Sequence, residues 1–299
     1  MVEVWFLYVI SAVLIWGINS IVDKVMLTKY LNSFSYLLLF IPASVILLIG
    51  TLLFVPINFN PTPFYFAFFG GAIAVIGYYL YAIVMKKEEA SRVAALTSLY
   101  PAFVAVLAAF IVNELFSLQT YVGIAIMILG AVLISYKRVS LKKMIPLTII
   151  LIIIGTNFAY AFEQTISKFS LEFYTLWQFF AIYTAGRIFM VLPSMAVPSF
   201  CKNFVRELKS LNRNIYILLA FSSTFWLLGV IFFFYAASLG PITLVSTISI
   251  TSPFVTLLAV LVISKFWPKI LKEEIDRKTV SLKLVAIVLI FLGTYLIVV

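Results

Sequence analysis

Predominantly apolar stretches alternate with short polar segments along the whole chain. Ten such stretches lie near 4–22, 34–55, 64–85, 93–113, 119–136, 145–167, 173–195, 214–236, 241–264 and 281–299. Each approaches or exceeds the roughly 20 residues that an α-helix needs to cross about 30 Å of hydrocarbon. Helices are expected because backbone N–H and C=O groups in lipid must find partners inside the protein. The pattern predicts an all-α polytopic membrane protein with ten transmembrane helices.

Composition excludes a water-soluble fold and most catalytic chemistry. The chain is 64% hydrophobic and 11% charged, whereas soluble domains are about 45–50% apolar and about 25% charged. It has no histidine and a single cysteine, Cys201, which rules out a Cys/His metal site, an internal disulfide and a histidine-based triad. We therefore predict no enzymatic activity, no metal and no cofactor. No cleavable signal peptide is expected, because the first stretch begins at Val4 without a basic segment before it.

Basic residues are distributed with a strong bias between the two sets of loops. Of 21 Lys and Arg residues, all but Lys168 and Arg187 fall in or beside the loops that follow odd-numbered stretches. By the positive-inside rule these loops are cytoplasmic, which places both termini outside. The net charge of +10 then reflects membrane topology, and no nucleic-acid partner is expected.

The loop at 196–213 has its own periodicity. Its apolar residues recur at helical spacing opposite a basic face; the two sets are Phe200, Phe204, Leu208 and Leu211, and Lys202, Arg206, Lys209 and Arg213. This pattern is typical of a short helix that lies on an anionic membrane surface.

The two halves of the chain resemble each other. Pro101 interrupts the fourth stretch and Pro253 the ninth, and we expect both to kink their helices. The fifth and tenth stretches each carry two small residues seven positions apart, Gly123 and Gly130 in one and Ala286 and Gly293 in the other. We infer five-helix repeats at 1–136 and 145–299, joined by a cytoplasmic linker at 137–144. Five spans per repeat make the second inverted, an arrangement found in secondary transporters with a midplane substrate site.

Several local motifs resemble the drug/metabolite transporter superfamily, in its ten-helix EamA-like branch. They are Trp16-Gly17-Ile18-Asn19 followed by Asp23-Lys24, the run from Ala90 to Pro101 followed by Asn113-Glu114, Trp177-Gln178, and Ser238-Leu239-Gly240-Pro241. The resemblance implies that spans one to four and six to nine surround a central cavity, with spans five and ten at the periphery.

The chain departs from that family at three points. Ser264-Lys265 stands where the second half would match Glu114, and the arginine often found early in the second span is absent near Pro42. The orientation that the charges predict is also opposite to that of several eukaryotic relatives.

Two charged residues lie inside predicted spans, where a charge costs roughly 2.5–3.5 kcal/mol or more. Arg187, in the middle of the seventh span, would hold an anionic group of the substrate; alternatively it snorkels or binds a helix carbonyl. Glu163, late in the sixth span, would be a titratable site for proton coupling; alternatively it pairs with Lys168 or caps a helix. A direct Arg187–Glu163 pair is not favoured by their positions along the two spans.

Uncharged candidates complete the predicted site. Asn19 and Asn157 each need a polar partner inside the membrane, so they serve either substrate contact or helix packing. The resemblance places Trp16, Tyr79, Tyr100 and Trp177 in cavity-lining spans, which implies an amphipathic or partly aromatic solute. Glu114, Asp23 and Lys24, at span ends, are interpreted first as helix caps or solvated loop residues.

These features together favour a secondary active transporter of a small organic metabolite, amphipathic and amino-acid-like or aromatic, that works by alternating access. The rival hypotheses are a lipid flippase or scramblase with the same basket-shaped cavity, and a membrane scaffold without transport. The expected setting is a cell membrane, plasma or inner, with the lipid bilayer and a small-molecule substrate as partners, protons as the candidate coupling ion and a monomer as the candidate assembly.

The charge bias yields a test of orientation. With both termini outside and the loops at 137–144 and 196–213 in the cytoplasm, a cysteine added after Val299 should react with a membrane-impermeant maleimide from outside in intact cells. The matched reporter is the native Cys201, which should react only after the membrane is opened. Labelling of the C-terminal cysteine from the cytoplasmic side alone would contradict the predicted orientation.

Overall fold

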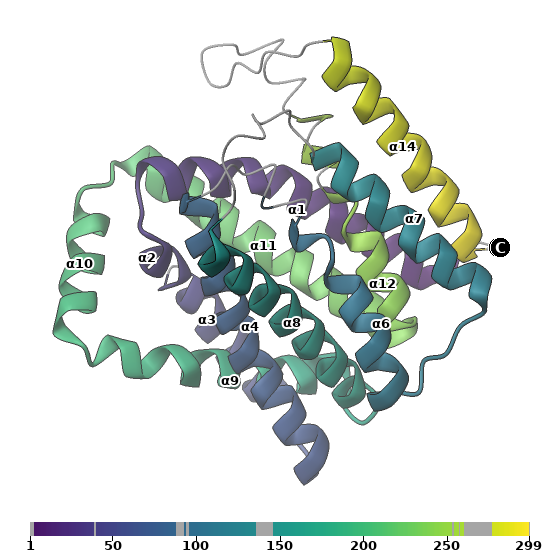
Figure 1. The fold of residues 1–299 in the computed structure, drawn as a ribbon. Helices are drawn as coiled ribbons and strands as arrows, with labels where there is room; N and C mark the ends of the chain where they lie inside the picture. Colours follow the sequence, from purple (N-terminus) through teal and green to yellow (C-terminus); the bar gives the residue numbers. More distant parts are fainter. Residues whose placement is uncertain are drawn as a thin grey trace.

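The computed structural model is a bundle of α-helices (Figure 1). The structure describes residues 3–38, 40–87, 93, 96–135, 146–252, 254–256, 258–259 and 277–298. Its helices are α1 (Val4–Lys29), α2 (Ser33–Leu38), α3 (Phe40–Phe54), α4 (Pro61–Lys87), α6 (Tyr100–Ile111), α7 (Leu118–Ser135), α8 (Leu147–Leu171), α9 (Leu176–Met195), α10 (Pro198–Lys209), α11 (Arg213–Leu239), α12 (Ile242–Ser249) and α14 (Arg277–Val298).

Each of the ten apolar stretches coincides with helix in the described residues, and none of these residues forms a strand. Six spans are long and apolar enough to cross a membrane: α1, the segment Phe34–Phe54, α4, α8, α9 and α11. The remaining apolar helices, among them α6, α7 and α14, are shorter within the described residues. Large apolar side chains are exposed on the outside, for example Leu53 (73%), Phe54 (84%) and Phe110 (82%), as expected for a surface that faces lipid. The chain is an all-α polytopic membrane protein.

The fourth and ninth spans are interrupted at corresponding places. One turn is at Ser98–Leu99 and the other at Ile250–Thr251. In both, the second residue of the turn is two positions before a proline in the sequence. Pro101 lies in the first turn of α6, where a missing N–H costs no intrahelical hydrogen bond. Pro253 lies outside the described residues.

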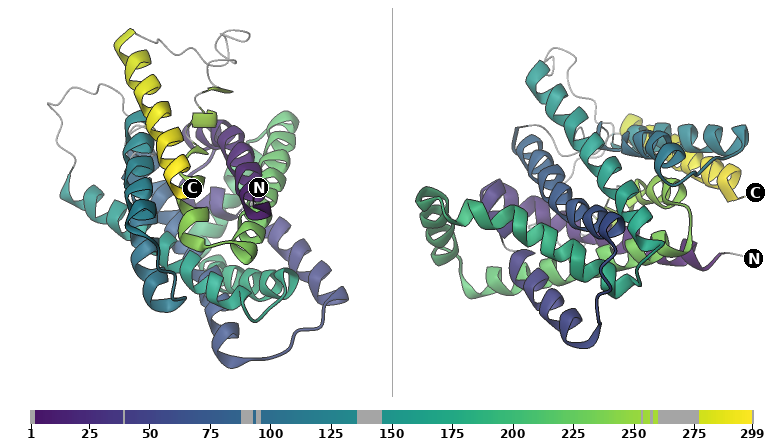
Figure 2. Two further views of the ribbon diagram at one scale, coloured as in Figure 1. Left: turned by 90° about the vertical axis from the view of Figure 1, so that its right-hand side faces the viewer. Right: turned by 90° about the horizontal axis from the view of Figure 1, so that it is seen from below.

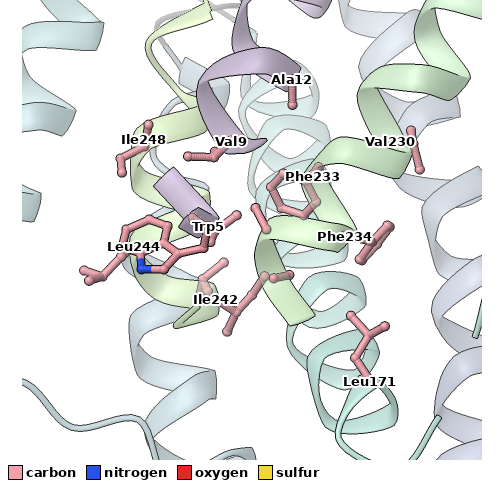
Figure 3. Close-up of a cluster of buried hydrophobic side chains, with 14 of the residues drawn as sticks. Trp5, Val9, Ala12, Leu171, Val230, Phe233, Phe234, Ile242, Leu244 and Ile248 are labelled. Carbon is pink, nitrogen blue, oxygen red and sulfur yellow. The ribbon is translucent and has the colours of Figure 1, made fainter. Parts of the chain in front are cut away.

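The main apolar core fills the space between α1, α11, α12 and α8 (Figure 3). Trp5 and Val9 of α1 meet Phe233 of α11 and Ile248 of α12 there, and all four are buried. The core therefore joins the first span to the eighth and ninth, so that the two halves of the chain share one interior.

Helices α7 and α14 pair at the edge of the bundle (Figure 2) through the small residues noted in the sequence. A Cβ atom on Gly123 would lie 3.0 Å from the carbonyl oxygen of Gly293, and one on Gly130 would lie 3.0 Å from that of Ala286. The order of these contacts makes the two helices antiparallel. Small residues let their backbones approach closely, which is how helices associate where no hydrophobic effect drives them together.

The beginning of α1 and the end of α14 lie at the same end of the bundle, and α10 crosses the opposite end (Figure 2). This is the arrangement that an even number of spans produces.

Helices α4 and α9 cross in backbone contact next to Arg187. A Cβ atom on Gly71 would overlap the carbonyl oxygen of Tyr183, and one on Gly186 would overlap that of Phe68. Only glycine fits at either position, because the neighbouring atom is backbone and has no side-chain rotamer with which to move away.

The crossing gives a stability prediction with an internal control. Gly186→Ala should lower the free energy of unfolding by about 1–3 kcal/mol, the usual cost of overpacking. Gly50→Ala in α3 should be neutral or slightly stabilising, because a Cβ atom there meets nothing within 4 Å and alanine is the better helix former. Thermal unfolding of the purified variants in detergent would measure both; equal stability of the two would show that the backbones do not touch at Gly186.

Candidate substrate site

A polar junction joins α1, α2 and α11 around the carboxylate of Asp23. Its Oδ1 atom accepts hydrogen bonds from Asn19 Nδ2 (3.0 Å) and Ser222 Oγ (3.3 Å), and also from the Tyr36 hydroxyl. Its Oδ2 atom accepts none from the residues that the structure describes. Three donors on one oxygen hold the carboxylate in a fixed orientation and leave the other oxygen available.

An aromatic row runs inward from this junction. The Tyr36 ring stacks with Tyr78 of α4 at 6.3 Å between centroids, and Tyr78 meets Trp226 of α11 edge-on at 6.4 Å. Tyr81 adds a further ring, 5.9 Å from Tyr78. Rings from three helices thus form a continuous, partly buried aromatic surface.

The guanidinium of Arg187 lies at the other end of the aromatic row. Its Cζ atom is 4.4 Å from the centroid of the Trp226 ring, a cation–π contact. The guanidinium also lies within electrostatic range of Glu163 and the Tyr183 side chain. Within the described part of the chain, no carboxylate or carbonyl accepts a hydrogen bond from Arg187. None of its five donors therefore has an acceptor among these residues.

The second charged candidate, Glu163, is buried beside Arg187. It is 5% exposed, and its Oε1 atom accepts a hydrogen bond of 2.9 Å from the hydroxyl of Tyr183 on α9. Sequence positions alone did not favour a direct Arg187–Glu163 pair. In the structure Glu163 bonds Tyr183 and Arg187 lies over Trp226, while the two charges are within electrostatic range of each other.

Tyr100 forms a third polar contact, between the fourth and ninth spans. Its hydroxyl lies 3.2 Å from the carbonyl oxygen of Ser246 on α12 and also bonds the hydroxyl of Ser249. Ser246 Oγ in turn donates to Gln164 Oε1 (2.6 Å) on α8. The ring of Tyr160 lies 6.1 Å from that of Tyr100, so this contact joins α6, α8 and α12 next to Glu163.

The remaining predicted residues divide between the interior and the surface. Asn19 is 3% exposed and belongs to the Asp23 junction. Trp16 packs on Gly229 of α11, and its Nε1 lies 3.5 Å from the carbonyl oxygen of Trp226. Tyr79 and Trp177 are 39% and 46% exposed, and neither makes a ring contact with Arg187 or Trp226.

Two charged residues near the end of the bundle where the chain begins and ends form hydrogen bonds with the ends of helices. The Glu114 carboxylate accepts the backbone N–H groups of Ile242 (2.7 Å) and Thr243 (3.0 Å), so it caps α12 and its negative charge meets the positive end of the helix dipole. Lys168 Nζ donates to the carbonyls of Ala237 (2.8 Å) and Gly240 (3.1 Å). The capping interpretation of Glu114 is confirmed, and Lys168 caps α11 without contacting Glu163.

Several site residues had no signal in the sequence strong enough to single them out. Tyr36, Ser222, Trp226 and Tyr183 look like ordinary residues of apolar spans. Asp23 was interpreted first as a span-end residue, because the predicted span ended near residue 22. In the structure α1 extends to Lys29, so Asp23 lies inside the helix. A longer first helix would have placed Asp23 one turn from Asn19 on the same face.

An apolar groove of about 460 Å³ lies elsewhere, between α6 and α7. Ala102, Val106, Phe110 and Ile128 are among its lining residues, and Arg187 is not. No group of three metal-ligating side chains occurs among the described residues.

Helices of this length and apolarity, with charged and aromatic side chains gathered inside them, define a polytopic membrane protein. A solved structure titled "Crystal structure of protein" has the same fold, with a TM-score of 0.70 at 15% identity, covering 98% of this chain and 96% of that one. No curated protein matches the sequence.

A known family matches the first half of the chain. Residues 3–136 match the model of the EamA-like transporter family. This match agrees with the resemblance of the sequence motifs to the drug/metabolite transporter superfamily. A match to this family suggests a membrane transporter of small molecules.

The Asp23 junction can be tested through stability. Tyr36→Phe removes one donor from a carboxylate held inside the membrane, and should cost about 1.5–3 kcal/mol, the usual contribution of a hydrogen bond to a charged group. Tyr65→Phe is the matched control, because Tyr65 is 50% exposed and makes ring contacts only. If thermal unfolding of the two variants is the same, the Tyr36 hydroxyl does not support Asp23.

Proposed function

We propose that the protein is a secondary active transporter of a small organic metabolite that carries an anionic group on an apolar or aromatic body. The observation that carries this proposal is Arg187. It is an arginine inside a span, stacked on Trp226, with no hydrogen-bond acceptor among the described residues. An unsatisfied guanidinium is expensive there, and a bound carboxylate or phosphate would offset that cost with bidentate hydrogen bonds.

Asn19, Trp16, Tyr100 and Glu163 complete the proposed site. The polar groups of Asn19 and Tyr100 lie at the contacts between halves, and Trp16 Nε1 lies 3.5 Å from the carbonyl oxygen of Trp226. Glu163 is assigned as the proton-coupling group, because it is buried and has one hydrogen-bond donor, Tyr183. Tyr79 and Trp177 are assigned to the margin of the site, since each keeps a large exposed area.

Alternating access would operate between two inverted halves, residues 1–136 and 145–299. Three features support the repeat. The family match ends at residue 136, turns precede both prolines by the same number of residues, and α7 and α14 pair in antiparallel orientation. The Asp23 junction and the Tyr100 contact both cross from one half to the other, so each would have to break or slide as the halves rock.

A lipid scramblase is the second candidate, because the groove between α6 and α7 is apolar. A scramblase needs a polar path for the headgroup, and the groove does not include Arg187 among its lining residues. The polar and charged residues proposed for the site lie on other helices than α7, and the only one on α6, Tyr100, is not among the residues that line the groove. We therefore favour the metabolite transporter.

Arginine substitutions test the proposal. A thermal-shift screen of the purified protein against a panel of anionic metabolites should give ligands that raise its melting temperature, since binding stabilises the native state by mass action. Arg187→Ala should remove this stabilisation, with binding weaker by about 1.5–3 kcal/mol, and Arg187→Lys should restore only part of it because the planar fork is lost.

Arg213→Ala is the control, since Arg213 is exposed at the start of α11, and it should respond to ligands like the wild type. Glu163→Gln should change the pH dependence of uptake more than ligand binding at a fixed pH. An Arg187→Leu protein that is as stable as the wild type and keeps the full ligand response would exclude Arg187 from the site.

A further inference from the structure

Helix α10 runs across the end of the bundle and connects the spans α9 and α11 (Figure 1). It has 12 residues, and none of them is buried. Because it lies across the direction of the spans it joins, it lies along the membrane surface when those spans cross the bilayer. The amphipathic pattern noted in the sequence therefore belongs to a helix at the membrane boundary.

The basic face of α10 has no protein partner. Lys202, Arg206 and Lys209, together with Arg213 at the start of α11, are exposed, and none makes a hydrogen bond or ion pair through its side chain in the described part of the chain. Unlike Glu114 and Lys168, these four side chains bridge no two helices in the described part of the chain.

Apolar side chains are exposed on the same helix. Phe200 and Val205 are 43% and 41% exposed. The combination of partly exposed apolar side chains and positive charges without a protein partner on one helix matches the boundary between acyl chains and anionic headgroups.

The acidic residue of α10 is directed toward the protein. Glu207 accepts hydrogen bonds from the backbone N–H of Asn32 (3.1 Å) and from its Nδ2 (2.6 Å). Asn32 in turn caps α2, because its Oδ1 accepts the N–H groups of Phe34 and Ser35, each at 2.9 Å. Glu207 therefore ties α10 to the turn between α1 and α2 and does not neutralise the basic face.

Apolar contacts strengthen the same link. The Phe34 ring lies 4.8 Å from that of Phe200, and Leu208 packs on the cluster that contains Met26 and Tyr36. Tyr36 is the residue that donates to Asp23. Helix α10 thus contacts the segment that forms the polar junction between the halves.

We propose that α10 is a docking surface for the headgroups of anionic phospholipids and that bound lipid stabilises the contact of α10 with the α1–α2 turn. The apolar residues would enter the acyl region while the four cations bind headgroup phosphates. An acidic segment of a protein partner would pair with the four cations but would not account for the exposed Phe200 and Val205. Lipid accounts for both properties of the helix, because its headgroups bind the cations and its acyl chains contact the apolar side chains.

The test uses the purified full-length protein in a neutral detergent, titrated with phosphatidylglycerol or phosphatidylcholine. We expect phosphatidylglycerol to raise the melting temperature more than phosphatidylcholine, with an effect that falls as salt screens the charges. The double variant K202Q/K209Q should bind phosphatidylglycerol on the order of 25-fold more weakly, since each of the two basic residues near an anionic surface contributes about fivefold. Soluble glycerol phosphate should have no effect, because it lacks the acyl chains.

The matched control is K86Q/K87Q, which removes two exposed charges at the end of α4. It should keep the wild-type response. Equal loss in both double variants would mean diffuse electrostatic attraction, and stabilisation by glycerol phosphate alone would mean an anion site that needs no membrane; either result overturns the proposal, as does a wild type that does not distinguish the two lipids.

Glu207→Gln tests the coupling to the α1–α2 turn. It should leave phosphatidylglycerol binding within about twofold of the wild type, because the basic face is intact. In the wild type the lipid should slow hydrogen exchange at Asn32–Leu38, and in the variant this protection should be lost. Unchanged protection in Glu207→Gln would show that α10 binds lipid without acting on the turn. These measurements need no transported substrate, so their outcome is independent of the role of Arg187.

Discussion

Inside a bilayer, a polar group has to find its partner within the protein, and most of the internal architecture follows from that constraint. Glu114 and Lys168 meet it at the ends of α12 and α11, where a charge also compensates the helix dipole. Asp23 meets it through three donors on one oxygen. The hydrogen bonds that make each of these charges tolerable in the membrane therefore also fix helices relative to each other.

Arg187 differs from these residues because its partners are electrostatic and aromatic. The ring of Trp226 and the charge of Glu163 lower the cost of the guanidinium, but they leave its N–H groups without acceptors. A fold that satisfies its other internal charges with hydrogen bonds and leaves these donors open has, in Arg187, a group suited to a ligand. The backbone contact of Gly186 with α4 holds it in position.

Contacts between the halves have a common character. The junction at Asp23 and the contact of Tyr100 with α12 are made by hydroxyl, amide and carboxylate groups, which would need new partners if the helices slide. The α7–α14 pair, by contrast, is held by close backbone packing, which tolerates little displacement. This division suits a transporter whose centre rearranges while its edge remains rigid. Helix α10 adds a contact at the membrane surface through Glu207.

The sequence by itself determined the class of protein, the positions of the spans and the identity of the internal charges. The length of each apolar stretch and the lack of other charges near Arg187 are local properties of the chain. They can be read from the sequence because an additional charge or a backbone without hydrogen bonds would be costly in lipid. It also indicated the small residues of α7 and α14, although the inversion of the halves remains a prediction. Only the tertiary structure decided which groups meet. Glu114 caps a helix 128 residues further along, and Asp23 is completed by Ser222, 199 residues away. Such pairings depend on how helices cross, and a helix of apolar residues can present any of several faces to its neighbours at similar cost, so no local pattern specifies them.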